Sequence, residues 1–468
     1  MKNQTKKIVT CLVLSFCITI INAQVNKISK VKSSRIETIM HSFLDQTKVP
    51  GISIAVSVQG ELIYCKGYGY SNKELGLSMD TESKLRTASV AKVITATALG
   101  KLMSDGKLNL DEPIKTYVPY IEKKYENLTA RQLASHTSGL AHRPKGNSYK
   151  KKQFDNIKET VGLMNSNLLF KPDTDFKYST HAFNFLAAVV EGASGKKYID
   201  YLNEDIFIPL GMKNTYPENI NQLSQDDAQL YFVDKLKAKR EKVTNGSYKL
   251  PGAGFRSTPT DMVRMMDAYR TGFITSSVVN EMFKSHSLKN GHKVNTGVVW
   301  RLSFDSFGNK VIEHAGNWLG ARTVVVYYPE KELTISLMIN ASCSILIEET
   351  AHLLSPLYLE EYMQNAPIVD LQRDLKLTFL GKTKKEYEGQ ISFHNQSGNL
   401  TTTNDGFLKS NPIIHLSGDD YTLITSYGLL HLKLVDKDRI IEGRGYIYET
   451  MNKENPTKKP AQLLFRAL

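Results

Sequence analysis

Apolar residues recur at regular spacing over most of the chain, and their spacing changes from one region to the next. Residues 34–46 place their apolar side chains on one face of a helix, namely Ile36, Ile39, Met40 and Phe43. Residues 52–58 and 61–70 are strand-like runs, joined by the turn-forming pair Gln59-Gly60. The N-terminal region therefore predicts a helix followed by a β-hairpin.

The central part of the chain is predominantly helical in pattern. Residues 89–104 predict a helix that ends at Asp105-Gly106, and residues 110–270 continue with helical segments and long polar loops. Thr258 is an expected helix cap, with Pro259 at the first helical position and Asp261 as the third-position acceptor.

Strand patterns return after this helical region. The strands are expected at 296–304, 309–314, 322–329 and 333–340, with a helix over 346–363. Strands thus lie at both ends of residues 34–363 and helices lie between them. This order predicts an α+β fold, in which an antiparallel sheet built from both ends of the segment is flanked by helices and carries a helical insert.

The C-terminal region has a different pattern of apolar and polar residues. Short alternating runs such as EGQISFH, YTLITSY, LHLKLVD and RGYIYET are separated by Gly, Asn and Asp. Such spacing is typical of an all-β module, a small barrel or a sandwich. We therefore divide the chain into residues 1–23, a main domain over 24–364 and a C-terminal module over 365–468.

Residues 1–23 have the pattern of a signal peptide. Lys2, Lys6 and Lys7 precede a mostly apolar run over 8–21, and Ala23 offers a small residue for cleavage. Fourteen residues are fewer than the roughly 20 that a membrane-spanning helix needs. We expect an exported protein, periplasmic or secreted, that begins at residue 24; an uncleaved N-terminal anchor is the alternative.

Charge and cysteine content narrow the function classes. The formal net charge is +13, and loss of the three lysines of residues 1–23 leaves +10. The basic residues are dispersed in polar loops such as 145–152 without interleaved aromatics, which argues against nucleic-acid binding and allows weak attraction to an anionic cell envelope. Cys65 and Cys343 remain after cleavage and are expected as two buried free thiols rather than a disulfide. No metal-ligand spacing occurs, so no metal or cofactor is expected.

The pattern Ser-x-x-Lys occurs four times, at 29–32, 89–92, 148–151 and 194–197. Only Ser89 and Lys92 stand at the start of an apolar helix, flanked by Val90, Ala91, Val93 and Ile94. Residues three apart share a helix face, and a buried lysine with a depressed pKa is a base for a serine hydroxyl. The alternative is a structural lysine paired with an acid. In the other three matches we expect a solvated lysine.

Two further residues stand in contexts that fit a catalytic site. Tyr178, in FKYSTHAFNFLAAVV, precedes an apolar helix, and His314, in VIEHAGNWLGART, ends a strand-like run and is followed by small residues. The alternatives are a core tyrosine and a hydrogen-bonded strand histidine.

In order and context, SVAK, YST and HAG resemble the three motifs of the serine beta-lactamase and penicillin-binding-protein-like family. The resemblance is strongest to its class C-like branch of esterases and D-amino-acid peptidases, and within it to the mitochondrial beta-lactamase-like serine protease, which shares Tyr-Ser-Thr. The segments PGISIAVSVQGELIYCKGYG, TARQLASHTSGL and PGAGFRSTPTDM also resemble the family, in family order. The resemblance covers about residues 34–360.

The resemblance implies a role for each motif residue. Ser89 would be the acylated nucleophile, and Lys92 would take its proton or stabilise the general base. Tyr178 would be that base as a phenolate and would later pass the proton to the leaving group. The backbone N–H groups of Ser89 and Asn317, the residue after Gly316, would form the oxyanion hole.

Two motif positions depart from the family. Thr180 replaces the usual asparagine, and His314 replaces a lysine that would supply a permanent charge for a substrate carboxylate. These changes favour esterase or peptidase activity over beta-lactam hydrolysis. His136, in HTSG, is expected to be structural, and Arg322 would need a bend in the chain to reach a substrate carboxylate.

The sequence therefore predicts an exported serine hydrolase that acts through an acyl-enzyme on Ser89, with an amide or ester of a small molecule or peptide as substrate. The alternatives are a beta-lactamase or D-Ala-D-Ala carboxypeptidase, and a non-catalytic envelope ligand-binding protein on the same fold. Loops near 140–155 and 215–250 are expected to shape the site. The sequence predicts neither the oligomeric state nor the role of the C-terminal module.

Overall fold

The computed structural model describes residues 25–359 continuously and, beyond them, a set of strands. These strands are 370–380, 384–394, 397–402, 411–417, 420–425, 428–436, 440–444 and 463–467. The predicted signal peptide (residues 1–23), the boundary at 364/365 and residues 445–450 of the run RGYIYET lie outside the described residues.

The central sheet is antiparallel and is built from both ends of the main domain, as the sequence predicts. Its strand order is β1-β3-β2-β13-β12-β11-β10, and β4 pairs with β3. The strands are β1 (Val25–Asn26), β2 (Gly51–Val58), β3 (Glu61–Asn72), β4 (Leu77–Ser78), β10 (Arg301–Phe304), β11 (Lys310–Trp318), β12 (Ala321–Tyr328) and β13 (Leu333–Ile339). The pairing of β2 with β13, from Val58↔Leu333 to Ile52↔Ile339, joins the two ends.

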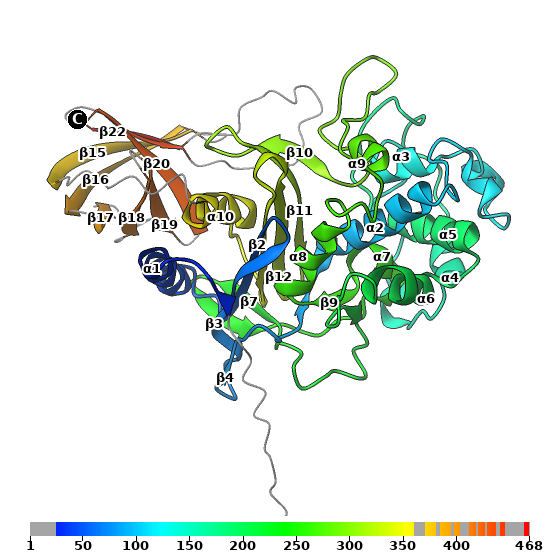
Figure 1. The fold of residues 1–468 in the computed structure, drawn as a ribbon, viewed down its shortest axis with the longest axis horizontal. Helices are drawn as coiled ribbons and strands as arrows, with labels where there is room; N and C mark the ends of the chain where they lie inside the picture. Colours follow the sequence, from blue (N-terminus) through cyan, green and yellow to red (C-terminus); the bar gives the residue numbers. More distant parts are fainter. Residues whose placement is uncertain are drawn as a thin grey trace, which may run out of the picture.

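The sheet separates two hydrophobic cores. Val325 on β12 faces the core shared with the helical region, whereas its neighbours Val324 and Val326 face the opposite core. Alternation along a strand sends successive side chains to opposite faces, so both faces of the sheet must be covered. On one side lie α2 (Ala91–Ser104), α5 (Ala182–Ser194) and α8 (Pro259–Asp267), and on the other α1 (Lys30–Thr47) and α10 (Ile347–Leu354) (Figure 1).

The helical region is more broken than the apolar pattern indicates. Its remaining helices are α3 (Ala130–Ala134), α4 (Ile157–Val161), α6 (Tyr198–Tyr201), α7 (Leu250–Ala253) and α9 (Ser276–Met282). Four short strands that the sequence did not predict also lie here, namely β6 (Tyr216–Pro217), β7 (Tyr231–Asp234), β8 (Lys237–Arg240) and β9 (Phe255–Ser257). Strands of two to four residues carry too few alternating positions to be recognised by periodicity.

Local turn and cap chemistry was mostly predictable. Gln59 and Gly60 both have positive φ angles, 52° and 79°, as the tight hairpin between β2 and β3 requires. Thr258 caps α8 by accepting a hydrogen bond from the Asp261 N–H. The Asp261 carboxylate, expected as a capping acceptor, instead accepts hydrogen bonds from Asn214 N and Thr215 Oγ1. The helix expected over 346–363 ends at Leu354 and continues to Tyr358 as a 3-10 turn around Pro356.

The C-terminal strands form their own eight-stranded sheet, in the order β21-β20-β19-β18-β17-β16-β15-β22. These strands are β15 (Asp370–Leu380), β16 (Lys384–His394), β17 (Ser397–Thr402), β18 (Asn411–Ser417), β19 (Asp420–Thr425), β20 (Gly428–Asp436), β21 (Ile440–Arg444) and β22 (Leu463–Ala467). The end strands β21 and β22 contact each other, so the sheet curls round like a barrel.

This second sheet is separate in its strand pairing but shares a core with the main domain. Figure 1 shows it on the far side of α1 and α10 from the central sheet. Leu416, Ile424 and Leu429 lie in the same buried cluster as Ile36 and Phe43 of α1. The two helices are therefore sandwiched between the two sheets.

Among the described residues, no helix is long and apolar enough to cross a membrane. Cys65 and Cys343 are both free thiols, as expected. Cys65 is buried, and its Sγ lies 3.0 Å from Thr260 Oγ1, whereas Cys343 is only partly buried.

Candidate active site

Ser89 stands at the junction between a strand and a buried helix. The short strand β5 (Leu85–Arg86) leads into the 3-10 turn η1 (Ala88–Val90), and α2 begins at Ala91. Ala88 has a φ of 45°, a left-handed conformation that is uncommon for a residue with a side chain. Strain of this kind is usually stored at functional sites. It turns the chain sharply just before Ser89, whose side chain is only partly buried.

Lys92 is the buried partner of Ser89. Its Nζ lies 3.2 Å from Ser89 Oγ and 2.7 Å from the Gly252 carbonyl oxygen, and the residue is completely buried. No carboxylate pairs with Lys92 within the described part of the chain, which argues against a structural ion pair. Burial, reinforced by the positive charge of Lys249, holds the pKa of Lys92 well below its usual value. A neutral amine at this distance can accept the serine proton.

The other three Ser-x-x-Lys matches do not form such a pair. Lys151 and Lys197 are exposed, as expected. Lys32 is buried, contrary to expectation, because its Nζ donates a hydrogen bond to the Leu359 carbonyl. Ser29 Oγ instead caps α1 by accepting a hydrogen bond from the Lys32 backbone N–H, while the Lys32 amine binds elsewhere.

Tyr178 lies beside the same lysine. The Lys92 Nζ is 5.0 Å from the centre of the Tyr178 ring. Burial raises the pKa of Tyr178 to about 12, although a hydrogen bond with Ser89 and the charge of Arg301 both oppose this shift. The phenolate that the family resemblance implies needs a lowered pKa, so the structure favours a neutral phenol. At neutral pH the deprotonated group beside the Ser89 hydroxyl is therefore the Lys92 amine rather than a Tyr178 phenolate.

His136 holds the segment that carries Tyr178. Its ring lies 4.3 Å from the Tyr178 ring, centre to centre, and its Nδ1 accepts a hydrogen bond from Ser179 N. Burial and the charge of Lys92 keep the pKa of His136 well below its usual value. Asp173, which lies shortly before Tyr178 in the chain, also binds the segment around His136. Its carboxylate accepts hydrogen bonds from Thr137 Oγ1 and Gln132 Nε2. These contacts agree with the structural role expected for His136.

Gly316 allows strand β11 to lie directly against the turn that carries Ser89. A Cβ at this position would stand 2.7 Å from the Thr87 carbonyl oxygen and 2.3 Å from Thr323 Oγ1. Thr323 Oγ1 in turn donates a hydrogen bond to the Thr87 carbonyl, 2.7 Å away. Strand β11 thus packs against the turn η1 that carries Ser89, and Asn317 is the next residue on that strand. The arrangement suits an oxyanion hole built from two backbone N–H groups.

His314 lies on β11 with its side chain buried. Burial and the charges of Arg301, Lys92 and His136 hold its pKa well below the usual value, so the imidazole is neutral at pH 7. Its Nδ1 lies 3.0 Å from the Ala315 carbonyl oxygen, which only accepts hydrogen bonds. The Nδ1 atom therefore carries the proton and leaves Nε2 as an acceptor. A cationic donor in the family pattern is here replaced by a neutral acceptor.

Two other residues named from the sequence are placed as follows. Thr180 is nearly buried, and its methyl group packs against Gly252, the residue whose carbonyl binds Lys92. Arg322 is brought opposite Asn317 by the β11–β12 hairpin, which supplies the bend that it needs. Its Nε donates a hydrogen bond to the Cys343 carbonyl, 2.8 Å away.

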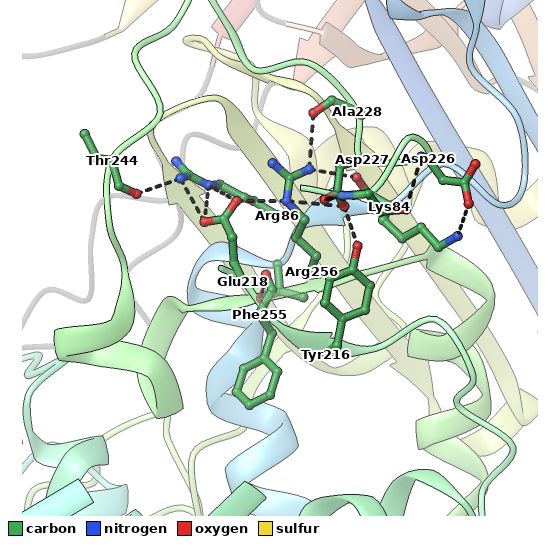
Figure 2. A network of polar contacts seen from close by, with 12 residues as sticks. Lys84, Arg86, Tyr216, Glu218, Asp226, Asp227, Ala228, Thr244, Phe255 and Arg256 are labelled. Carbon is green, nitrogen blue, oxygen red and sulfur yellow. Dashed lines mark hydrogen bonds and ion pairs between the residues drawn. The ribbon is translucent and has the colours of Figure 1, made fainter. Parts of the chain in front are cut away.

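A buried charge network that sequence patterns did not reveal holds β5, the strand that leads to Ser89 (Figure 2). The Glu218 carboxylate lies between two guanidinium groups, those of Arg86 on β5 and Arg256 on β9. All three side chains are almost fully buried. Arg256 also makes an ion pair with Asp227, which accepts a hydrogen bond from Tyr216.

Arg86 connects this network to both segments that carry the candidate oxyanion donors. It stands three residues before Ser89, and its Nη1 donates a hydrogen bond to the Leu319 carbonyl in the β11–β12 hairpin. Its guanidinium lies 4.0 Å from the centre of the Trp318 ring. One side chain therefore sets the position of the hairpin relative to the nucleophile.

Lys249 is the second residue that sequence reasoning missed. Its Nζ lies 3.6 Å from the centre of the Trp318 ring, and it directly precedes α7, which contains Gly252. Burial and the charges of Arg86, Arg143 and Lys150 lower the pKa of Lys249 to about 7. No motif in SYKLPGAG marks this lysine.

The arrangement is suited to acyl transfer. It provides a hydroxyl, an adjacent base of lowered pKa, a neutral phenol and two candidate oxyanion donors. Among the described residues, no group of His, Cys, Asp or Glu side chains is placed to hold a metal ion.

The charge network makes a prediction about stability. Glu218→Gln keeps the shape of the side chain but leaves two buried guanidinium groups without their shared anion, which should destabilise the protein by about 3–5 kcal/mol. Denaturation followed by tryptophan fluorescence measures this, because both tryptophans, Trp300 and Trp318, lie in the main domain. Glu159→Gln, which breaks the exposed pair with Lys152, is the matched control and should leave the midpoint nearly unchanged. Equal midpoints for the two variants would contradict the role of Glu218.

The buried amine makes a prediction about pH. The pKa of Lys92 is lower in the folded than in the unfolded chain, so between these two values the unfolded chain binds more protons and stability rises with pH. Lys92→Met should therefore raise the free energy of unfolding at neutral pH by about 1–2 kcal/mol and abolish reaction at Ser89. In the wild type, acylation should rise with pH and reach its plateau below the ordinary lysine range. A destabilised Lys92→Met variant, or an acylation limb above pH 10, would contradict this account.

Comparisons with known proteins identify the family of the chain. The sequence profile of the beta-lactamase family matches residues 36–346. The human serine beta-lactamase-like protein LACTB, mitochondrial, is 30% identical over 325 residues, which are 53% of this chain and 59% of that protein. The chain thus matches somewhat more than half of the length of this relative.

Two solved structures share the fold. The octameric penicillin-binding protein homologue from Pyrococcus abyssi aligns with a TM-score of 0.60 at 21% identity and covers 88% of this chain and 98% of its own. That share extends beyond residues 25–359 into the C-terminal strands. The D-amino acid amidase from Ochrobactrum anthropi, complexed with L-phenylalanine, aligns with a TM-score of 0.55 at 23% identity and covers 65% of this chain and 92% of its own. The chain therefore belongs to the beta-lactamase family, a family of serine hydrolases.

Proposed function

We propose that the protein hydrolyses an ester or amide of a small molecule or peptide through an acyl-enzyme on Ser89. The observation that carries this proposal is the completely buried Lys92 amine, 3.2 Å from the Ser89 hydroxyl and without a carboxylate partner among the described residues. A lysine with a purely structural role would not be stabilised by burial without a carboxylate partner. A general base needs this burial, because it lowers the pKa of the amine. A non-catalytic binding protein on the same fold would not need a strained turn and a neutral lysine at this point.

The steps follow from the geometry. Ser89 Oγ attacks the substrate carbonyl carbon while the neutral Lys92 amine accepts the hydroxyl proton. The N–H groups of Ser89 and Asn317 stabilise the developing oxyanion. The neutral Tyr178 phenol, hydrogen-bonded to Ser89, gives its proton to the leaving group and is reprotonated from Lys92. Water then attacks the acyl-enzyme by the same path in reverse and releases the acid.

The residues around the nucleophile favour esters or peptide-like amides over beta-lactams. Neutral His314 offers no charge to the carboxylate that beta-lactams and D-Ala-D-Ala peptides carry, and Thr180 lacks an amide group. The amidase that shares this fold shows that the scaffold is compatible with amide hydrolysis. Beta-lactam hydrolysis is the second candidate, on family membership alone.

A fluorophosphonate probe tests the proposed nucleophile. The wild-type protein should form an adduct on Ser89, detected by mass spectrometry, and Ser89→Ala should form none. Ser148→Ala, which removes the serine of another Ser-x-x-Lys match, is the control and should be labelled like the wild type. Absence of an adduct on Ser89 at pH 7 to 9 would rule the proposal out.

We also propose that the protein is exported, with cleavage after Ala23. The support is the basic start and apolar run of residues 1–23. N-terminal sequencing of protein recovered from the periplasm or medium should begin at Gln24. Recovery of the intact N-terminus from the cytoplasm would contradict export.

A further inference from the structure

We propose that Lys249, standing over the face of Trp318, binds a carboxylate on the substrate, so that the preferred substrates are acids as well as esters or amides. This inference rests on the proposed function of Ser89 and names the substrate class for it. The carboxylate would thus be recognised by the segment that precedes α7 rather than by β11, the strand that carries His314.

Lys249 lies between two parts of the catalytic machinery. Its Nζ is 3.6 Å from the centre of the Trp318 ring, and Trp318 is the neighbour of Asn317, the expected oxyanion donor. On its other side, the chain continues from Lys249 into α7, where the Gly252 carbonyl accepts a hydrogen bond from Lys92. A group bound to Lys249 is therefore close to the reacting carbonyl.

Lys249 is a half-buried cation without a counter-ion. In the described parts of the chain, no carboxylate forms an ion pair with Lys249. Its ammonium group instead lies over the aromatic rings of Tyr248 and Trp318. Glu218 is the acid whose charge acts on it, but that carboxylate is already bound by Arg86 and Arg256. Burial first, and then the neighbouring cations, lower the pKa of Lys249 to about 7, and a bound carboxylate would favour its protonated form. A substrate carboxylate would supply the missing anion.

Two loops beside Lys249 extend the positive charge. Residues 141–155 and 244–249, here called the basic loop pair, are fastened by hydrogen bonds from Phe154 N to Ser247 Oγ and from Asn245 Nδ2 to the Lys152 carbonyl. The rings of Tyr149 and Tyr248 also pack together, 4.9 Å apart. The first loop contains five lysines and arginines and one acid, Asp155. An anionic substrate meets an attractive potential here.

His314 does not compete for the same group. Its imidazole is neutral and presents an acceptor at Nε2, which repels a carboxylate. Among the groups close to Ser89, Lys92 must also be neutral to act as the base. Arg301 is paired with Glu348 and Arg86 with Glu218, and Arg322 binds the Cys343 carbonyl. Among the described basic residues near Ser89, we therefore assign Lys249 to an anionic substrate.

A matched pair of esters tests the proposal. Mono-4-nitrophenyl adipate carries a carboxylate, and its methyl ester carries none; release of 4-nitrophenolate is measured for both and corrected for the spontaneous rate. The wild type should prefer the carboxylate ester in kcat/KM by about tenfold or more, as a charge-assisted hydrogen bond implies. Lys249→Met should remove this preference, and Lys249→Arg should retain most of it.

Two controls make the result specific. Lys213→Met removes the same charge from an exposed position and should keep the preference of the wild type. Fluorophosphonate labelling of Ser89 in each variant shows that the site is folded. If both esters are hydrolysed but the wild type shows no preference, or Lys249→Met keeps it, the carboxylate site is refuted while the function of Ser89 stands. If neither ester is hydrolysed and Ser89 is not labelled, the proposed function itself fails.

Discussion

The buried contact between Glu218 and the two arginines is the constraint on which the site depends. Arg86 lies in the strand that delivers Ser89, and Arg256 lies in the neighbouring strand β9, so their shared carboxylate fixes these two strands. The same Arg86 guanidinium holds the Leu319 and Thr244 carbonyls. A planar guanidinium with five N–H donors in a fixed geometry can donate to acceptors on three segments at once, which a lysine could not do. Three segments far apart in sequence thereby acquire one common reference point.

The electrostatics around Ser89 follow from burial and from the lack, among the described residues, of a carboxylate paired with Lys92 or Lys249. Lys249 and Arg301 contribute positive charge near Lys92 and His314, and desolvation is the main cause that keeps His136 and His314 neutral. Each cation makes protonation of the next one harder, so the amine beside Ser89 is neutral without any dedicated partner. Burial of these basic groups is unfavourable for folding, and the packing of the apolar helix α2 and the Glu218 charge network offset it.

The sequence was informative where the determinants are local. The hairpin at Gln59-Gly60 and the cap at Thr258 each depend on a few neighbouring residues, and burial of Lys92 is implied by the apolar residues beside it. The contact of Arg86 with Glu218 joins positions 132 residues apart and leaves no periodic trace. Lys249 resembles any loop lysine until the fold places it on Trp318. The raised pKa of Tyr178 likewise depends on its surroundings, which the motif Tyr-Ser-Thr does not specify.

The position of α1 between the two sheets has a consequence for the order in which the chain can fold. This helix is among the first elements to be synthesised, yet its Arg35 donates a hydrogen bond to the Leu416 carbonyl, 381 residues later. Its apolar face, including Phe43, is completed by Leu429 of β20. Contacts at such separation form late, because the intervening loop must first be closed. The main domain therefore has to wait for nearly the whole chain before its outer helical layer is covered. A truncated product would expose that layer to solvent and to other chains.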